Sequence, residues 1–300
     1  MLTRRTFLSR ASAAALAAPF ASAFAEESSA SPRYPIHTFT KPFQKLSFED
    51  TADVIAEVGY DGIELPLRKG GQILPERVEE DLPKMVEALQ KRGKVVGHLT
   101  TDLYSPDEPH AEKILRTAKK LGITKYRLGF RRYDLKKPIQ PQLDALKPGL
   151  KDLAAMSKDI GVQGGIQNHS GADYVGSAVW DIYELVRGLE PAQLGTCFDI
   201  GHATVEGGTN WPLHARLMQP WFTFVYVKDV TWENGPKGFV PKWGPLGTGV
   251  VHPEFFTWLK TTPYAGPICQ HCEYLTGATP EDRAQMKKDL ALLKSWLAAH

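Results

Sequence analysis

Histidines, acids and a lysine recur in this sequence where short apolar stretches end. His169 lies in "GIQNHSG", and Asp199 with His202 closes "TCFDIGHA". Lys228 lies in "VYVKDV", and Glu273 ends "CQHCEY". Carboxylates and imidazoles bind divalent cations, and imidazoles also move protons near neutral pH. Because the ends of parallel strands meet at one edge, the pattern predicts an enzyme site built from several strands.

Two of these motifs have structural alternatives. Asp199 and His202, three residues apart, can share a divalent cation or a substrate hydroxyl. Alternatively, Asp199 caps the next turn and His202 bonds to the backbone. Glu273 ends an apolar strand, where an acid is rarely structural unless it is paired. His271 shares a face with Glu273 one layer deeper, so it is either a supporting partner or a core histidine.

Lys228 alternates with Tyr226 in its strand, so both side chains face the same side. Lys228 can bind a carbonyl or hydroxyl oxygen there, or act as a base if burial lowers its pKa. An ion pair with a carboxylate is the alternative. In "GIELPLRKGGQ", Glu64 can bind a sugar hydroxyl, and the loop with Arg68 can bind an anion or be simply solvated.

The stretch "TWENGPKGFVPKWGPLGTG", residues 231–249, has the Gly- and Pro-rich composition of a shaped active-site loop. Trp211, Trp232 and Trp243 are expected in loops on this side of the molecule. We predict that Trp232 and Trp243 bind substrate, because exposed tryptophans beside polar groups suit the face of a carbohydrate ring. Packing in the core is the alternative for each.

The elements that position these residues follow a repeated pattern, in which an amphipathic helix ends at a glycine and a short apolar strand follows. These glycines are expected in the left-handed conformation that ends helices; they are Gly59, Gly93, Gly122 and Gly161. Ser47 is expected to cap a helix, and an acidic turn to begin the C-terminal one. Further strands are predicted at 35–39, 194–199, 222–228 and 267–273.

Eight strands alternating with helices predict an α/β protein with a closed parallel (β/α)8 TIM barrel, as a single domain over residues 35–300. A doubly wound sheet is the alternative, but no glycine-rich dinucleotide turn follows the first strand. The three cysteines are predicted to be buried free thiols, because strand positions three apart face opposite sides; they are Cys197, Cys269 and Cys272.

The N-terminus has the pattern of an export signal. "TRRTFLSR" precedes an uncharged Ala-rich run with a small-residue ending, which predicts a twin-arginine signal peptide at 1–25 and a linker at 26–34. An ordinary secretory signal or an uncleaved anchor is the alternative. The run is too short and Ala-rich for a good membrane span. We therefore expect a periplasmic or other extracytoplasmic protein.

Composition and charge narrow the function. The 300 residues are 42% hydrophobic and 23% charged, as in ordinary soluble proteins. Residues 1–25 contain three arginines and no acid, so the mature chain keeps 33 of the 36 basic residues against 34 acidic ones, a net charge of −1. Such a chain lacks the positive charge expected of a nucleic-acid-binding protein.

The ordered motifs "DGIEL", "QNHSG", "FDIGHA", "VKD", "PLGTG" and "EY" resemble the sugar phosphate isomerase/epimerase family of xylose isomerase-like TIM barrels. The resemblance covers nearly all of the mature chain and is closest to an exported subgroup with twin-arginine signals. It implies one divalent metal, often Mn²⁺, held by Glu, Asp, His and Glu on strands five to eight. Asp199 and Glu273 match, whereas Gln167 replaces the first Glu and Tyr226 the His.

The resemblance therefore implies a metal held by Asp199 and Glu273, with Gln167 as a weak ligand through its amide oxygen. His169, His202 or His271 can substitute for a missing ligand, and the resulting predicted metal set is Gln167, Asp199, His271 and Glu273.

Gln167 cannot accept a proton, so the family's proton transfer between two glutamates is not available. We predict an exported enzyme that removes a proton next to the carbonyl of an unphosphorylated keto-sugar or keto-glycoside, followed by isomerisation, epimerisation or β-elimination. The predicted catalytic residues are His169, His202 and Lys228, assisted by a divalent metal. A non-catalytic sugar-binding barrel is the alternative, and an apurinic-endonuclease-like phosphodiesterase is a minor one.

Overall fold

The structure, a computed structural model, describes residues 33–236, 238–275 and 277–298. The predicted signal peptide and most of the predicted linker lie outside the described residues. The barrel strands are β1 (Ile36–Phe39), β2 (Gly62–Pro66), β3 (Val95–Thr100), β4 (Lys125–Arg127), β5 (Gln163–Gln167), β6 (Leu194–Asp199), β7 (Phe222–Val227) and β10 (Ile268–Gln270).

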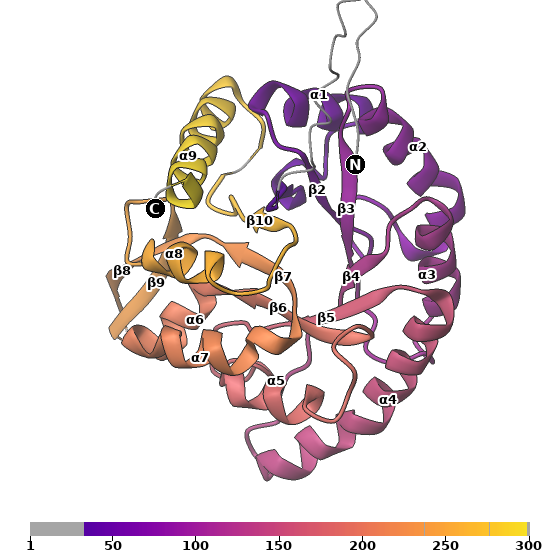
Figure 1. Cartoon of the computed structure of the whole chain (residues 1–300), viewed down its shortest axis with the longest axis vertical. Coiled ribbons are helices and arrows are strands. Elements are labelled where there is room, and N and C mark those ends of the chain that lie inside the picture. The colour runs from indigo at the N-terminus through magenta and orange to yellow at the C-terminus, as the bar shows by residue number, and fades with distance from the viewer. Residues whose placement is uncertain (1–32, 237, 276, 299–300) are drawn as a thin grey trace, which may run out of the picture. The chain divides into compact units, whose positions relative to one another are not determined.

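These eight strands are all parallel and close in the order β1-β10-β7-β6-β5-β4-β3-β2, which confirms the predicted TIM barrel (Figure 1). Helices surround the strands. They are α1 (Phe48–Val58), α2 (Val78–Gln90), α3 (Ala111–Lys120), α4 (Ile139–Ile160), α5 (Val179–Val186), α6 (Ile200–Gly207), α7 (Trp211–Met218), α8 (Glu254–Lys260) and α9 (Pro280–Ala298). Among the described residues, no helix is both long enough and apolar enough to cross a membrane.

The predicted helix boundaries are confirmed. The Ser47 hydroxyl accepts a hydrogen bond from the backbone N–H of Asp50 and so caps α1. All four predicted glycines have positive φ angles, from 66° at Gly93 to 96° at Gly59, a conformation that is strained for residues with a Cβ atom. Helix α9 begins with an acidic first turn, as expected.

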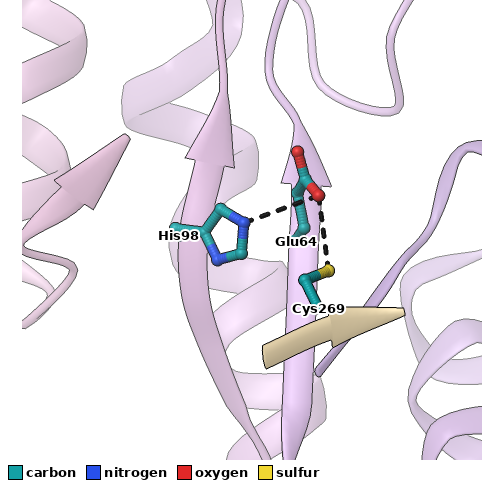
Figure 2. A group of neighbouring side chains, drawn as sticks. All are labelled: Glu64, His98 and Cys269. Atoms are coloured by element: carbon teal, nitrogen blue, oxygen red, sulfur yellow. Dashed lines mark hydrogen bonds and ion pairs between the residues drawn. The ribbon is translucent and has the colours of Figure 1, made fainter. Parts of the chain in front are cut away.

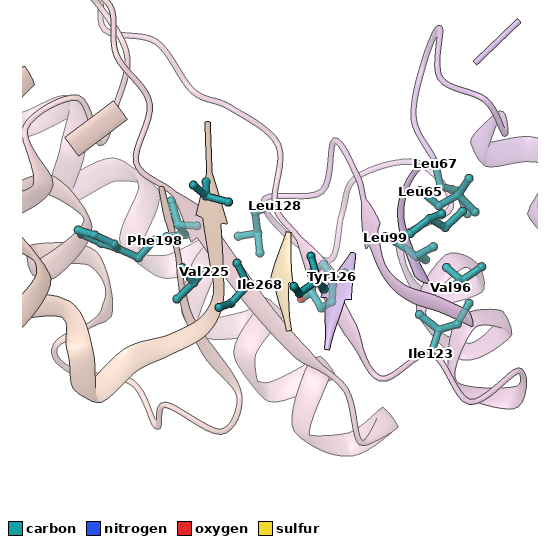
Figure 3. Packing of buried hydrophobic residues seen from close by; sticks show 14 of the residues in the cluster. Leu65, Leu67, Val96, Leu99, Ile123, Tyr126, Leu128, Phe198, Val225 and Ile268 are labelled. Atoms are coloured by element: carbon teal, nitrogen blue, oxygen red, sulfur yellow. The ribbon is translucent and has the colours of Figure 1, made fainter. Parts of the chain in front are cut away.

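The core lies between the strands and the surrounding helices. Strands β2 and β6 are buried on both faces, as expected for parallel strands covered by helices. Leu65, Leu99 and Tyr126 are fully buried in this layer (Figure 3). Burial of each such side chain stabilises the fold by about 1.5–3 kcal/mol. The three cysteines are buried free thiols, as predicted.

The prediction of a shaped active-site loop at 231–249 is wrong in that most of this segment is strand. Residues Asp229–Gly235 (β8) and Gly238–Gly244 (β9) form a two-stranded antiparallel hairpin, in which Trp232 faces Pro241. The glycines and prolines suggested a loop, although strand-forming residues lie between them. Proline is tolerated because both strands of such a ribbon have a free edge. Trp211 is also not in a loop but is the buried first residue of α7.

Candidate active site

A small cavity of about 50 Å³ lies at the carboxyl ends of the barrel strands, where TIM barrels carry their active sites. Six of the predicted site residues line it, namely Arg68, Gln167, His169, Lys228, His271 and Glu273. Sequence reasoning did not single out the other four lining residues. The complete lining is Phe39, Lys41, Arg68, Arg127, Phe130, Gln167, His169, Lys228, His271 and Glu273.

Gln167, at the end of β5, links two groups of opposite charge. Its amide oxygen accepts a hydrogen bond from the Arg127 guanidinium, and its amide nitrogen donates to Asp199 Oδ2 at 2.8 Å. An amide both donates and accepts, whereas a carboxylate only accepts. A glutamate at this position would lose the bond to Asp199 and place two negative charges side by side. This explains why a glutamine fits here.

Asp199 is held rigidly at the end of β6. The side-chain amide of Asn168 donates to the Asp199 carbonyl at 2.9 Å and accepts from the Asp199 N–H at 2.8 Å. Asp199 Oδ1 accepts from the backbone N–H of His202 at 3.1 Å and caps α6. The capping alternative is therefore confirmed, and Asp199 Oδ2 remains directed at its charged neighbours.

Lys228 follows β7, and its ammonium lies between two carboxylates. Lys228 Nζ is 3.4 Å from Asp199 Oδ2 and 3.1 Å from Glu273 Oε1, and it lies 4.6 Å from the ring centre of Trp243. Burial alone would lower the pKa of Lys228, but Asp199 and Glu273 outweigh burial and raise it. Lys228 is thus an ammonium group in an ion pair, and the prediction of a lysine base is wrong.

Gly201 makes room for this lysine. A Cβ atom at Gly201 would lie 2.8 Å from Lys228 Cγ and 2.7 Å from the Lys228 carbonyl oxygen. The glycine in "FDIGHA" therefore lets α6 start directly beside the lysine.

The two candidate catalytic histidines have different surroundings. His169 lines the cavity, and its Nδ1 donates to the Ser170 carbonyl at 2.9 Å, which leaves Nε2 as the acceptor nitrogen. Burial, followed by the charge of Lys228, lowers the pKa of His169 to about 4, so the ring is neutral at physiological pH. His202 is buried and does not line the cavity; its Nδ1 accepts from the Ser170 N–H at 3.1 Å. His169 is therefore the better placed base.

Glu64, in the middle of β2, is completely buried and does not line the cavity, so the predicted contact with a sugar hydroxyl is wrong. Figure 2 shows it beside His98 and Cys269. Its carboxylate accepts hydrogen bonds from His271 at 2.7 Å and from Tyr226 at 3.1 Å, and further bonds from Thr100 and Cys269. Burial would raise the pKa of Glu64, but the nearby histidines hold it well below its usual range.

The predicted metal ligands do not present a ligand set around a common point. The Lys228 ammonium lies between Asp199 and Glu273, and the Gln167 amide oxygen is taken by Arg127. His271 uses Nε2 to bind Glu64, which raises the pKa of His271 against the opposing effect of burial and favours its protonated form. The four residues therefore do not fit the expected metal, and we assign no chemical step to an ion there.

A different group of described residues could hold a metal ion. Ligand-type atoms of Glu64, His98 and Cys269 lie within 4.8 Å of one another, and all three residues are buried (Figure 2). Glu64 Oε2 is 3.5 Å from His98 Nε2 and 3.3 Å from Cys269 Sγ. A mixed nitrogen, oxygen and sulfur donor set suits zinc better than manganese.

The predicted substrate-binding residues are only partly brought together. Arg68 lines the cavity, and Trp243 packs against Lys228 and edge-on against His202. Trp232 instead lines a separate surface hollow with Trp211. Arg127 was missed, although its alternation with Lys125 in β4 indicates a cationic face directed into the barrel.

Asp229 explains why "VKD" and "PLGTG" occur together. Its carboxylate accepts hydrogen bonds from the backbone N–H groups of Val230, Gly247, Gly249 and Val251, at 2.8–3.0 Å. The aspartate therefore fastens the loop after the hairpin onto the end of the barrel and has a structural role.

The family model described as "Xylose isomerase-like TIM barrel" matches residues 52–296. The chain belongs to this family. Its closed barrel and the site at the strand ends agree with the resemblance seen in the sequence. No curated protein matches the chain in sequence.

Solved structures of the same fold cover nearly the whole barrel. D-psicose 3-epimerase from Clostridium cellulolyticum H10, with D-tagatose, has a TM-score of 0.66 and 12% identity over 88% of this chain and 99% of its own. D-allulose 3-epimerase from Methylomonas sp., with D-allulose, has a TM-score of 0.65 and 16% identity over 88% of this chain and 97% of its own. A xylose isomerase-like TIM barrel protein from Mycobacterium smegmatis, in complex with magnesium, has a TM-score of 0.64 and 15% identity over 88% of this chain and 98% of its own.

Proposed function

We propose that this member of the xylose isomerase-like family is a carbohydrate-active enzyme that removes a proton next to the carbonyl of a keto-sugar or keto-glycoside. The supporting observation is the pairing in one cavity of a neutral imidazole, His169, with a cationic amine, Lys228. Neighbours of the same fold are sugar epimerases. A base and an adjacent positive charge are what enolate formation requires.

In the proposed first step, His169 Nε2 takes the proton from the carbon next to the carbonyl. The C–H electron pair forms a C=C bond, and the carbonyl π electrons move to oxygen, giving an enediolate. Lys228 stabilises this oxygen, because an ammonium has three N–H donors and no more than two point at Asp199 and Glu273.

We favour β-elimination as the second step, because it needs a single base. The enediolate re-forms the carbonyl, the carbon–oxygen bond to the leaving group breaks, and the leaving oxygen takes the proton from the His169 imidazolium. The products are an unsaturated ketone and an alcohol. Epimerisation would need a second proton donor on the opposite face, where Gln167 replaces a carboxylate.

Deuterium incorporation tests the proposal. Mature protein is incubated in heavy water with a methyl keto-glycoside or with D-fructose, and NMR follows both the carbon next to the carbonyl and any released methanol. We expect exchange or release with wild type, loss with His169→Gln, and no change with His252→Gln, which alters an exposed histidine of the separate hollow. Binding of these sugars without exchange would instead indicate the non-catalytic sugar-binding barrel.

We also propose export by the twin-arginine route, on the basis of Arg4, Arg5 and the Ala-rich run that follows. An extracytoplasmic location favours unphosphorylated substrates. Cell fractionation of wild type and of a variant with both Arg4→Lys and Arg5→Lys tests this part separately. Retention of the variant in the cytoplasm is expected, and equal export of both proteins would contradict the proposed route.

For the buried group, we propose zinc as the ion that fits best. Glu64, His98 and Cys269 would hold it, and it would stabilise the barrel rather than contact substrate, since none of the three lines the cavity. Elemental analysis of wild type and Cys269→Ser decides this: zinc present in the first and lost in the second supports it, and zinc absent from both contradicts it.

A further inference from the structure

The cavity carries more positive than negative charge. Its lining holds the basic groups Lys41, Arg68, Arg127 and Lys228, whereas the lining carboxylate is Glu273. Behind this lining, Glu64 lies 3.6 Å from Arg127 and Asp199 lies 3.4 Å from Lys228, whereas Asp102 acts on Arg68 from beyond ion-pair distance. Glu273 itself pairs with Lys41 and Lys228, so Arg68 remains without a directly paired carboxylate.

Arg68 is the clearest unmatched cation. Its guanidinium makes no hydrogen bond or ion pair with the described residues, and its nearest described ring is Phe39, with the guanidinium carbon 5.9 Å from the ring centre. Burial, followed by the charge of Arg127, lowers the pKa of Arg68. Two guanidinium groups thus repel each other across the cavity, which an anion between them would relieve.

Arg127 supplies an independent sign of a missing ligand. The residue is 97% buried, since only 3% of its surface is exposed, yet its Nε–H has no hydrogen-bond partner. The nearest carboxylate oxygen, Glu64 Oε1, is 3.6 Å from that nitrogen. A buried donor without a partner costs about 1–3 kcal/mol. Its guanidinium also stacks over Phe130 at 4.6 Å, which fixes the plane in which an acceptor must lie.

We propose that the substrate carries an oxyanion, in first place the carboxylate of a sugar acid, and that Arg68 and Arg127 bind it. Planar guanidinium forks match carboxylate and phosphate oxygens, so a phosphate ester shares this chemistry. The inference rests on the proposed function, because it takes the cavity as the carbohydrate site. The cavity of about 50 Å³ is below the usual size of a ligand pocket, so it receives one charged end of the substrate.

Calorimetric titration with D-glucuronate, a glucose monophosphate and D-glucose tests the proposal. We expect wild type to bind glucuronate about tenfold or more tightly than glucose, as one charge-assisted hydrogen bond predicts. Arg68→Met should abolish this preference, and Arg68→Lys should keep part of it. Arg187→Met, on the exposed end of α5, is the matched control and should keep all of it.

The remaining outcomes are equally decisive. Tighter binding of the phosphate than of glucuronate, lost in Arg68→Met, supports the oxyanion site and identifies phosphate as its source. Equal affinity for glucuronate and glucose, no detectable binding of either anion, or an anion preference that survives Arg68→Met overturns the proposal.

Proton exchange in heavy water separates this inference from the proposed function. If glucuronate binding depends on Arg68 but no keto-sugar shows exchange, the anion site is supported and the enzyme proposal is refuted. Exchange on neutral keto-sugars that is unaffected by Arg68→Met would support the enzyme proposal and count against the anion site.

Discussion

Glu64 and Glu273 both lie beside His271, yet the two carboxylates have opposite surroundings. His271 Nε2 is 2.7 Å from Glu64, and its Nδ1 is 3.7 Å from Glu273. Glu64 has no exposed surface and is ringed by donors, whereas the Glu273 side chain is 21% exposed and pairs with Lys41 and Lys228. Glu64 thus belongs to an inner, closed network, in which buried donors satisfy both carboxylate oxygens. Glu273 belongs to an outer, open network beside the cavity, in which its lysine partners have donors to spare.

The difference separates stability from function. A closed network of buried charges holds the barrel together and has no group directed at a substrate in the cavity. An open network next to a cavity can exchange one of its partners for a substrate oxygen. We therefore expect substitutions in the inner network to reduce the free energy of unfolding, and substitutions in the outer one to reduce activity.

The largest effect is expected for Glu64→Leu. Removal of this carboxylate leaves the Arg127 guanidinium without its buried counter-charge and the His271 ring without its hydrogen-bond partner, which should lower the free energy of unfolding by about 3–5 kcal/mol. Urea denaturation measures this. Glu273→Leu is the matched substitution at the partly exposed position and should cost about 1 kcal/mol or less. Similar losses for both variants would contradict the distinction between the networks.

Lys228→Met should come next, as a loss of activity. Without the ammonium that stabilises the enediolate, kcat should fall about 10²–10³-fold, the usual effect of removing one such donor. Steady-state kinetics on the keto-sugar that shows exchange measures it. Lys242→Met, in the exposed Lys242–Glu233 pair of the hairpin, is the control and should leave kcat unchanged. An unchanged kcat in Lys228→Met would place the stabilising charge elsewhere.

Substitution of Lys228 also tests whether Asp199 and Glu273 can bind a metal ion. Removing the ammonium leaves Asp199 and Glu273 facing each other without a cation, so Lys228→Met should bind Mn²⁺ about tenfold more tightly than wild type. Calorimetric titration with manganese chloride measures this. Tight Mn²⁺ binding by wild type that weakens in Asp199→Ala would instead show that the ion displaces Lys228, in line with the original ligand prediction.

The sequence could predict the barrel because its evidence is local. Helix-ending glycines, the Ser47 cap and the apolar strands are each visible within a few residues. Strand-end residues such as His169 and Lys228 followed from the same pattern. The hairpin was missed because its glycines and prolines suggested a loop, although strand-forming residues occupy the positions between them.

The site's partners could not be predicted in the same way, because they depend on contacts across the barrel. Glu64 meets His271 and Tyr226 from strands far away in the sequence, so its burial is invisible locally. Gln167 appeared to be a weakened metal ligand because its two partners, Arg127 and Asp199, come from different strands. A polar residue at a strand end indicates a site, but its role depends on which charges oppose it.

A change of pH is expected to have the smallest effect on kcat/KM over the neutral range. The base form of His169 is needed, and its pKa is lowered to about 4, so kcat/KM should be flat from neutral pH down to about 5 and fall tenfold per unit below about 4. Because the ammonium is the second cause of this lowering, Lys228→Met should move the acid limb upward, part of the way to the ordinary histidine value near 6.5. A pH profile of the residual activity measures the shift. An acid limb that stays in place would mean that burial alone sets the pKa of His169, and that the open network acts on the substrate without acting on the base.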